Sequence, residues 1–348
     1  MMSPDSYQPP LLLKNGLAMT LYAALKASQR WQTTIALPEP PYYSCVFAGA
    51  GGVPIFGKMA LPERARATIV ATYGITGTLE NQWYLSLLGR KAYAQGYGVV
   101  LFDWRAHGHT AVLSPTLTSD GLHEGEDFVR IAAQAQKLGF PAPFWFSGYS
   151  LGGQLALWAV AYGQNRELGL PLDPADVGGG FVICPNLDSE RSLSYIVGHP
   201  LGRRLEQSVA KELGRLAAEL STYHPESFDP AAIARAKTIW GFDHELTIGQ
   251  LGFATVSDYY TATNGLRLLP TLTKPVFLLY AADDPMFDPA IVSDLRRLAP
   301  QSPHLSLHVT DHGGHVGYIS SEACQRTWGD PDQWWAWNRA LDWLEPQG

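Results

Sequence analysis

The stretch Phe144-Trp145-Phe146-Ser147-Gly148-Tyr149-Ser150-Leu151-Gly152-Gly153 decides how the rest of the chain is interpreted. The apolar run 143–146 predicts a short buried strand, and the apolar run 154–162 predicts a helix. Between them stands Gly-x-Ser-x-Gly, the pattern of a nucleophile elbow. In such a turn the serine is held in a strained backbone conformation, and the glycines two positions away let the strand and the helix approach closely. We therefore predict that Ser150 is a nucleophile. The alternative is a turn rich in glycine and serine that carries no chemistry.

A serine hydroxyl needs a base to take its proton, normally a histidine oriented by a carboxylate. On a sheet of this type the chain order is serine, acid, histidine, and the sequence supplies both partners in that order. Asp283 and Asp284 directly follow the apolar run 275–282. We favour Asp284 as the acid and expect Asp283 to be a neighbour or a helix-capping residue. The alternative is that both are turn aspartates without a role in chemistry.

The candidate base lies in the segment Asp311-His312-Gly313-Gly314-His315-Val316-Gly317. Gly313 and Gly314 precede His315, and Gly317 follows it two positions later. These glycines leave the approach of the histidine to a serine sterically open. We therefore favour His315 over His312, which we expect to be a loop residue or a neighbour of the site.

Negative charge on a reacting carbonyl oxygen needs two hydrogen-bond donors. The backbone N–H of Leu151, directly after the predicted nucleophile, is one candidate. The other is the N–H of Ile75, in the loop after the β-branched run 67–73, where Gly74 and Gly77 allow the backbone to turn inward.

Apolar runs typical of strands alternate with helical patterns along most of the chain, which predicts a mostly parallel central sheet covered by helices on both faces. The expected fold class is thus α/β. The expected strands are 42–48, 53–61, 67–73, 97–104, 143–146, 180–184, 275–282 and 304–310, and the expected helices are 17–29, 81–95, 122–138, 154–162, 289–298 and 332–344.

The alternation stops between about residues 189 and 268. Apolar residues in the segment 201–220 recur every three or four positions, as in an amphipathic helix; they are Leu201, Leu205, Val209, Leu213, Leu216 and Leu220. We predict one α/β domain over 1–348, with a helical cap inserted at about 189–268 and an N-terminal arm at about 1–40. The alternative for the insertion is a set of helices packed at the edge of the sheet.

Composition narrows the class of partner. Lys and Arg number 25 and Asp and Glu 32, for a net charge of −7, and no basic run suggests nucleic acid. The N-terminus lacks a signal peptide pattern, and we expect no membrane span, although peripheral membrane contact stays open. Three scattered cysteines, Cys45, Cys184 and Cys324, fit a reducing compartment, so we expect a cytoplasmic protein.

The sequence predicts neither a metal nor a cofactor. His107 and His109 form a His-x-His pair, but no Asp-His partner follows, and we expect both to be exposed loop residues. No Gly-x-Gly-x-x-Gly opens a helix, so a dinucleotide is not indicated.

Taken together, these motifs resemble those of the α/β hydrolases, and within them the YheT-like group, which includes plant embryogenesis-associated proteins and animal α/β-hydrolase-domain lipases. The similarity covers nearly the whole chain. It includes 9–10, 14–20, 74–77, the elbow, 282–285 and 313–317. The segments 242–247, 252–253 and 258–260 resemble a stretch specific to this group. The resemblance implies a serine esterase or lipase acting on an acylglycerol or other acyl ester, with Ser150, Asp284 and His315 as the triad.

Two alternatives stay open at this point. The chain could be a non-catalytic binding protein that keeps the fold, because a fold alone does not prove an activity. It could also use the same triad on thioesters or amides.

Overall fold

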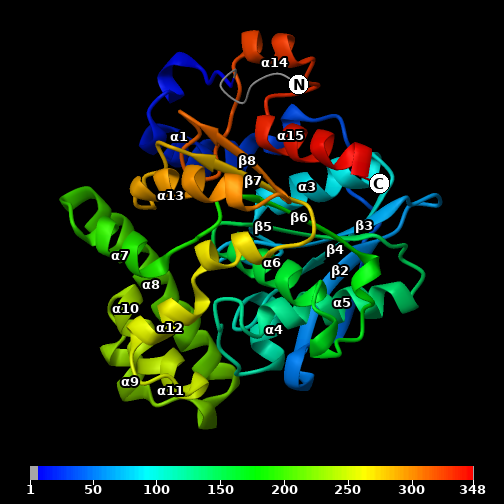
Figure 1. The fold of residues 1–348 in the computed structure, drawn as a ribbon. Helices are drawn as coiled ribbons and strands as arrows, with labels where there is room; N and C mark the ends of the chain where they lie inside the picture. Colours follow the sequence, from blue (N-terminus) through cyan, green and yellow to red (C-terminus); the bar gives the residue numbers. More distant parts are fainter. Residues whose placement is uncertain (1–6, 348) are drawn as a thin grey trace.

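The computed structural model describes residues 7–347, so the first six residues of the predicted N-terminal arm lie outside the described part. Eight strands form one sheet in the order β1-β2-β4-β3-β5-β6-β7-β8 (Figure 1). Their bounds are β1 Tyr43–Ala48, β2 Pro54–Ala60, β3 Ala67–Thr72, β4 Tyr97–Phe102, β5 Phe144–Tyr149, β6 Val177–Ile183, β7 Val276–Ala281 and β8 Leu305–Thr310. Every predicted strand is present, with ends shifted by a few residues.

The sheet is antiparallel only at one edge, where β1 pairs with β2 and β2 pairs with β4. From β4 to β8 all neighbours are parallel. The strands β3, β4, β5 and β7 are buried at every position, because helices cover both faces. The helices α3 (Trp83–Ala94) and α15 (Trp335–Leu344) lie together over one face, and α5 (Glu124–Lys137) and α6 (Leu151–Gly163) over the other (Figure 1). The predicted helix-covered, mostly parallel sheet is confirmed.

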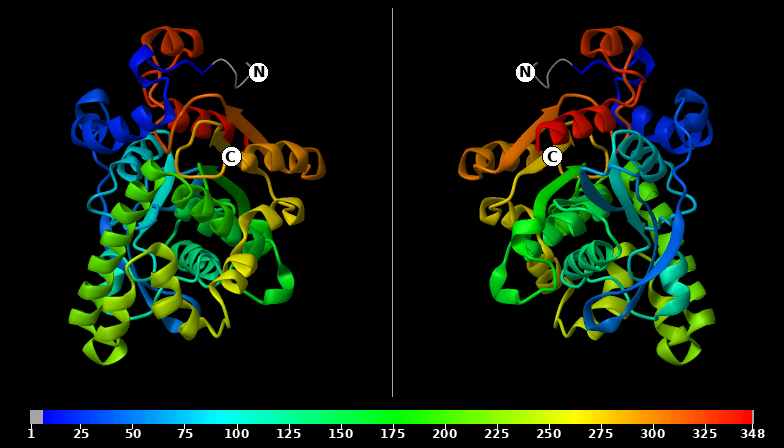
Figure 2. Two further views of the ribbon diagram at one scale, coloured as in Figure 1. Left: turned by 90° about the vertical axis from the view of Figure 1, so that its left-hand side faces the viewer. Right: turned by 90° about the vertical axis from the view of Figure 1, so that its right-hand side faces the viewer.

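Residues 189–268 contain helices and no strand. These are α7 Ser189–Val197, α8 Pro200–Tyr223, α9 Pro230–Arg235, α10 Ile239–Phe242, α11 Ile248–Leu251 and α12 Val256–Thr263. They gather on one side of the molecule, with α8 as the longest (Figures 1 and 2). A separate apolar cluster joins this insertion to the body, because Leu213 and Leu220 of α8 pack with Ala111 and Leu117. Ala111 belongs to α4 (Gly108–Leu113), which the sequence patterns did not predict.

The N-terminal segment lies away from the insertion, at the other end of the molecule (Figures 1 and 2). Its helix α1 (Gly16–Tyr22) continues through a π-helical turn, Ala23–Ala27, into α2 (Ser28–Arg30). Two more helices complete the fold, α13 (Ala290–Leu298) after β7 and α14 (Glu322–Trp328) before α15. Across residues 7–347, no helix combines the length and the apolar character that crossing a membrane requires.

Candidate active site

The turn from β5 into α6 is strained at one residue. Ser150 has φ 54° and ψ −126° and stands at the N-terminal cap of α6, a conformation that costs free energy for a residue with a side chain. The flanking glycines are sterically required. A Cβ on Gly148 would lie 2.0 Å from the carbonyl oxygen of Gly152, and a Cβ on Gly152 would lie 2.2 Å from the carbonyl oxygen of Tyr73. The sequence therefore places glycine where strand, helix and the neighbouring strand meet.

The loop after β3 lies against this serine. A Cβ on Gly74 would come within 3.0 Å of Ser150 Cβ. The N–H of Gly74 donates to Tyr84 Oη at 3.1 Å, and the N–H of Thr76 donates to His107 Nε2 at 3.1 Å. Within residues 7–347, the N–H groups of Ile75 and Leu151 donate no hydrogen bond. Both residues border the same cavity as Ser150, so two free backbone donors lie close to its hydroxyl.

His107 is not the exposed loop residue that the sequence suggested. Its side chain is buried against Trp104 with the ring centroids 3.7 Å apart. Burial lowers the pKa of His107 to about 4, so the ring is neutral near pH 7. Nε2 accepts the Thr76 N–H, and Nδ1 therefore carries the proton and donates to the carbonyl oxygen of Arg105 at 2.8 Å. His107 thus fixes the donor loop in place.

His109 and Asp103 have different surroundings. The His109 side chain is half exposed, with Nε2 3.0 Å from Glu80 Oε1. Asp103 is fully buried and accepts hydrogen bonds from Tyr73 Oη and from the N–H groups of Leu79 and His109. Asp103 therefore holds together the ends of β3 and β4. In the part of the chain that the structure describes, no three His, Cys, Asp or Glu side chains gather in a way that could hold a metal ion.

Asp284 and His315 are brought together although 31 positions separate them. His315 Nδ1 lies 2.8 Å from Asp284 Oδ2, and the other oxygen of Asp284 accepts the N–H of Met286 at 2.8 Å. The carboxylate is 2% exposed, so water does not compete for it. It fixes the His315 ring with Nε2 as the free nitrogen.

Asp283 has a separate contact. Its Oδ1 accepts the N–H of Gly314 at 2.9 Å, which ties it to the loop that carries His315. Of the two roles expected for Asp283, it therefore has that of a neighbour of the site and does not cap a helix. His312 lies 3.5 Å from Asp283 Oδ2, beside the loop, as expected.

The N-terminal helix supports the histidine from behind, a role that sequence patterns did not reveal. The N–H of His315 donates to Thr20 Oγ1 at 2.8 Å. A Cβ on Gly314 would lie 2.4 Å from the carbonyl oxygen of Gly16, and a Cβ on Gly16 would lie 1.8 Å from the carbonyl oxygen of Asp283. The close approach of α1 thus requires glycine on both sides. Only the run of small residues Gly313-Gly314 hinted at such a neighbour.

The His315 side chain makes its hydrogen bond to Asp284, and none joins it to Ser150 within the described residues. Phe287 lines the cavity beside Ser150 and packs edge-on against the His315 ring, with centroids 5.1 Å apart. The histidine therefore lies at the edge of the cavity. Hydrogen bonds between catalytic groups are often long or poorly aligned in proteins without substrate and tighten when substrate binds.

The cavity lies between the sheet and the insertion, with an open volume of about 930 Å³ that includes solvent at its mouth. Most of its lining is apolar, and α8 contributes Val209, Leu213 and Leu216. Among the aromatic residues of the insertion, Phe242 and Tyr260 line the cavity. Trp240 is instead half exposed, and Phe253 and Tyr259 pack in a separate cluster.

Comparison with known proteins finds a hydrolase family model and relatives whose names are those of hydrolases. The α/β hydrolase family model matches residues 76–327. A Synechocystis sp. protein named "Putative esterase slr0264" is 54% identical over 97% of this chain and 94% of its own length. The protein named "Putative esterase YheT" from Escherichia coli is 27% identical, over 79% of this chain and 76% of its own. Mouse "Phospholipase ABHD3" is 28% identical over 73% of this chain, a region that spans 59% of the mouse protein.

Solved structures agree on the fold. The Pyrococcus furiosus esterase Pf2001 superposes with a TM-score of 0.55 over 98% of this chain and 97% of its own, at 15% identity. At that identity the likeness shows the fold alone.

Proposed function

The chain belongs to the α/β hydrolase family, and we propose that it is a serine hydrolase that cleaves carboxylic esters through an acyl-enzyme. The observation that carries the proposal is the strained Ser150 beside two unpaired backbone donors, with the Asp284–His315 pair at the same end of the sheet. The names of the relatives, which include esterases, a phospholipase and a monoacylglycerol lipase, support an ester as the substrate.

In the proposed first half-reaction, His315 Nε2 takes the proton of Ser150 Oγ as that oxygen attacks the ester carbonyl carbon. The carbonyl oxygen becomes an oxyanion that the N–H groups of Ile75 and Leu151 stabilise. Asp284 stabilises the imidazolium and holds its tautomer. The intermediate then breaks its bond to the alcohol oxygen, which takes the proton from His315 Nε2 and leaves.

The second half-reaction repeats these steps with water. His315 removes a proton from the water as its oxygen attacks the acyl carbon, and the same two N–H groups receive the new oxyanion. Breakage of the bond to Ser150 Oγ, with return of the proton from His315, releases the acid and restores the enzyme.

The insertion is proposed to act as the cap that shields this reaction from water and receives the acyl chain. Its contribution of Leu213, Leu216 and Phe242 to the cavity supports that role.

A fluorophosphonate probe and chromogenic acyl esters of graded length test the proposal. The wild-type protein is expected to react with the probe and to turn over the esters, whereas Ser150→Ala does neither. The matched control is Ser194→Ala, at an exposed position of α7, which should behave as wild type. A Ser150→Ala protein that keeps labelling and turnover would exclude the serine mechanism. Parallel thioester and amide substrates decide whether esters are preferred.

A further inference from the structure

One wall of the cavity is acidic. Asp120, from the loop before α5, and Asp243, directly after α10, both line it and are 7% and 8% exposed. Tyr260 Oη donates to Asp243 Oδ2 at 2.6 Å, and Thr118 Oγ1 lies 3.4 Å from Asp120 Oδ1. The cavity lining, all within residues 7–347, includes no Lys or Arg. The two carboxyl groups therefore face an apolar space without a cation to balance them.

A second feature of the same cavity is a hydroxyl without a partner. Ser192 of α7 lines the cavity and is 5% exposed, and its Oγ makes no hydrogen bond within the described residues. A buried polar atom is normally satisfied, so an orphan in a cavity wall indicates that something from the cavity completes it.

The acidic pair is unfavourable as a purely structural feature. Burial raises the pKa of Asp120 well above its ordinary value, and the nearby charges of Asp243 and Glu124 raise it further. Burial also raises the pKa of Asp243 to about 6, although the hydrogen bond from Tyr260 opposes the shift. Perturbed acids in a cavity are more typical of binding or catalysis than of folding.

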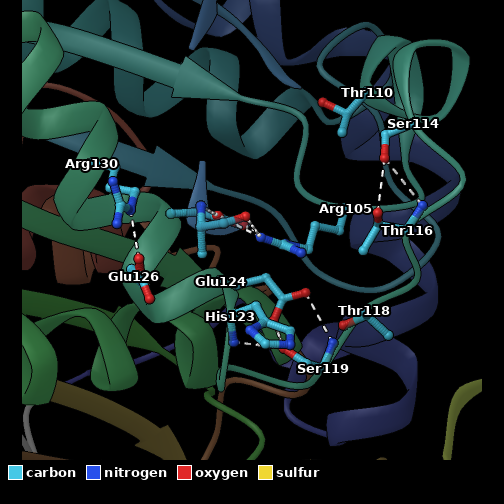
Figure 3. A network of polar contacts seen from close by, with 12 residues as sticks. Arg105, Thr110, Ser114, Thr116, Thr118, Ser119, His123, Glu124, Glu126 and Arg130 are labelled. Carbon is cyan, nitrogen blue, oxygen red and sulfur yellow. Dashed lines mark hydrogen bonds and ion pairs between the residues drawn. The ribbon is translucent and has the colours of Figure 1, made fainter. Parts of the chain in front are cut away.

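The Asp120 loop is nevertheless held firmly in place. Asp120 has φ 48°, the left-handed region that side chains rarely adopt. Glu124 accepts hydrogen bonds from the N–H and the hydroxyl of Ser119, at 3.0 and 2.6 Å, and from the N–H of Gly121 at 3.0 Å. Figure 3 shows Glu124 beside Thr118 and Ser119 in this network.

The same loop is tied to the helix that follows the nucleophile. Gln154, in the first turns of α6, donates from Nε2 to the carbonyl oxygen of Asp120 at 2.8 Å and to that of Thr263 at 3.0 Å. Thr263 ends α12, which also carries Tyr260. The acidic pair is thus positioned relative to Ser150 through one side chain.

We propose that Asp120, Asp243 and Ser192 form a site of hydrogen-bond acceptors for the alcohol part of the ester. That alcohol part carries hydrogen-bond donors and no negative charge. Hydroxyl groups of a polyol or the N–H groups of an ammonium satisfy these acceptors, whereas a phosphate or free carboxylate meets the negative charge of Asp243. The inference rests on ester hydrolysis at Ser150 as proposed above. It adds to that reaction a substrate class, monoesters of polyols or amino alcohols.

Binding to the Ser150→Ala protein tests the site without turnover. The probes share a dodecyl chain and differ in the head: 1-O-dodecylglycerol, dodecylammonium, dodecyl methyl ether and dodecyl phosphate, each below its micelle concentration. Trp104 lines the cavity, so tryptophan fluorescence reports binding. The glycerol ether or the ammonium is expected to bind at least about tenfold more tightly than the methyl ether, or about 1.4 kcal/mol, and the phosphate more weakly than either.

Asp120→Asn and Asp243→Asn, each made in the Ser150→Ala background, are expected to reduce that preference about tenfold and to weaken the exclusion of phosphate. Asparagine keeps the size of aspartate and tolerates the left-handed backbone at position 120. Ser192→Ala is an independent variant that should reduce the preference less. Asp258→Asn, an exposed aspartate of α12, is the matched control and should leave it unchanged.

Two results would overturn the proposal. One is a methyl ether that binds as tightly as both the glycerol ether and the ammonium. The other is a pair of Asn variants that keep the wild-type preference while their Tm falls, which would assign the pair to folding. If the wild type hydrolyses no ester while donor-dependent binding persists, the proposed reaction fails and the acceptor site is supported. If Asp120→Asn and Asp243→Asn weaken the binding of the glycerol ether but not that of dodecylammonium, the site recognises a polyol.

Discussion

The contrast between two adjacent aspartates offers the sharpest test of the proposed triad. Asp284 accepts from His315 Nδ1 at 2.8 Å and from the N–H of Met286 at 2.8 Å, one bond to each oxygen. In Asp284→Asn, the amide oxygen can keep the Met286 bond only if the NH₂ group faces the histidine. An NH₂ donor opposite Nδ1 requires Nδ1 to be the acceptor, so the imidazole proton moves to Nε2. The base then holds a proton where it needs a lone pair.

The expected loss is large because the tautomer, and not only a hydrogen bond, is changed. In other serine hydrolases such a substitution lowers kcat by about 10⁴, which corresponds to about 5 kcal/mol of transition-state stabilisation. Asp283→Asn is the matched control. Its amide oxygen can still accept the Gly314 N–H, and only the contact with His312 at 3.5 Å is lost. A net hydrogen-bond change of about 1 kcal/mol limits that loss to about fivefold.

Stopped-flow measurement of the acylation burst with a chromogenic ester separates the two variants, and thermal unfolding shows whether each is folded. A folded Asp284→Asn protein that stays within tenfold of wild type would refute the assignment of the acid. So would a larger loss in Asp283→Asn than in Asp284→Asn.

Three further predictions concern the nucleophile, the donor loop and the cap. Ser150→Ala should lower kcat by about 10³ or more with unchanged circular dichroism, measured with any ester that wild type cleaves; a smaller loss contradicts the acyl-enzyme. Burial lowers the pKa of His107 to about 4 in the folded protein, below its unfolded value, so stability is full above about pH 6.5 and is lost as pH falls toward 4, by up to about 3 kcal/mol. His107→Gln should flatten urea-unfolding free energies over that range, and an unchanged slope contradicts the assignment. Ester selectivity should rise about fourfold per methylene, from about 0.8 kcal/mol each, until the cavity is full. Leu216→Trp, at a partly buried position that lines the cavity, should move this limit to shorter chains, whereas Leu201→Trp on the exposed side of the same helix should not; equal profiles would show that α8 only packs.

The strands could be predicted because each is a short apolar run bounded by Gly, Pro or polar residues. The helix α4 could not, because tertiary contacts define it. Its first turn is anchored by the Asp103 carboxylate, which accepts the N–H of His109, and the Thr110 hydroxyl donates to the carbonyl oxygen of Asp103. A six-residue segment with little intrinsic helix preference becomes helical only in that setting.

The apolar pattern of α8 predicted the helix correctly and its buried face only in part. Leu213 and Leu220 are buried, but Leu201 is 48% exposed, and small or polar positions such as Ala210 and Glu206 are buried instead. The periodicity argument assumes one partner surface. This helix contacts α7, α10 and α4 and also borders a cavity, so its apolar positions do not share one environment.

The proposed triad residues follow local motifs at strand ends, so their geometry could be expected from the sequence. Asp120, Asp243 and Ser192 could not be grouped in that way, because they come from three separate segments that only the insertion brings together. One signal existed: Asp243 lies in the stretch 242–247, which resembles a segment specific to the YheT-like group. No spacing rule connects that stretch to the loop that carries Asp120.

The triad could be predicted and the residues of the cavity wall could not, and this difference has a physical cause. At the elbow, a single added carbon on Gly148 or Gly152 would meet backbone at about 2 Å, so the motif admits no variation and is easily recognised. In the cavity wall, a change at Val209 or Leu216, which are only partly buried, mainly alters the shape of a partly open space, which the fold tolerates. Relatives can therefore share every motif of the reaction and still differ in the ester they accept, and the choice of substrate has to be derived from the surfaces that the insertion presents.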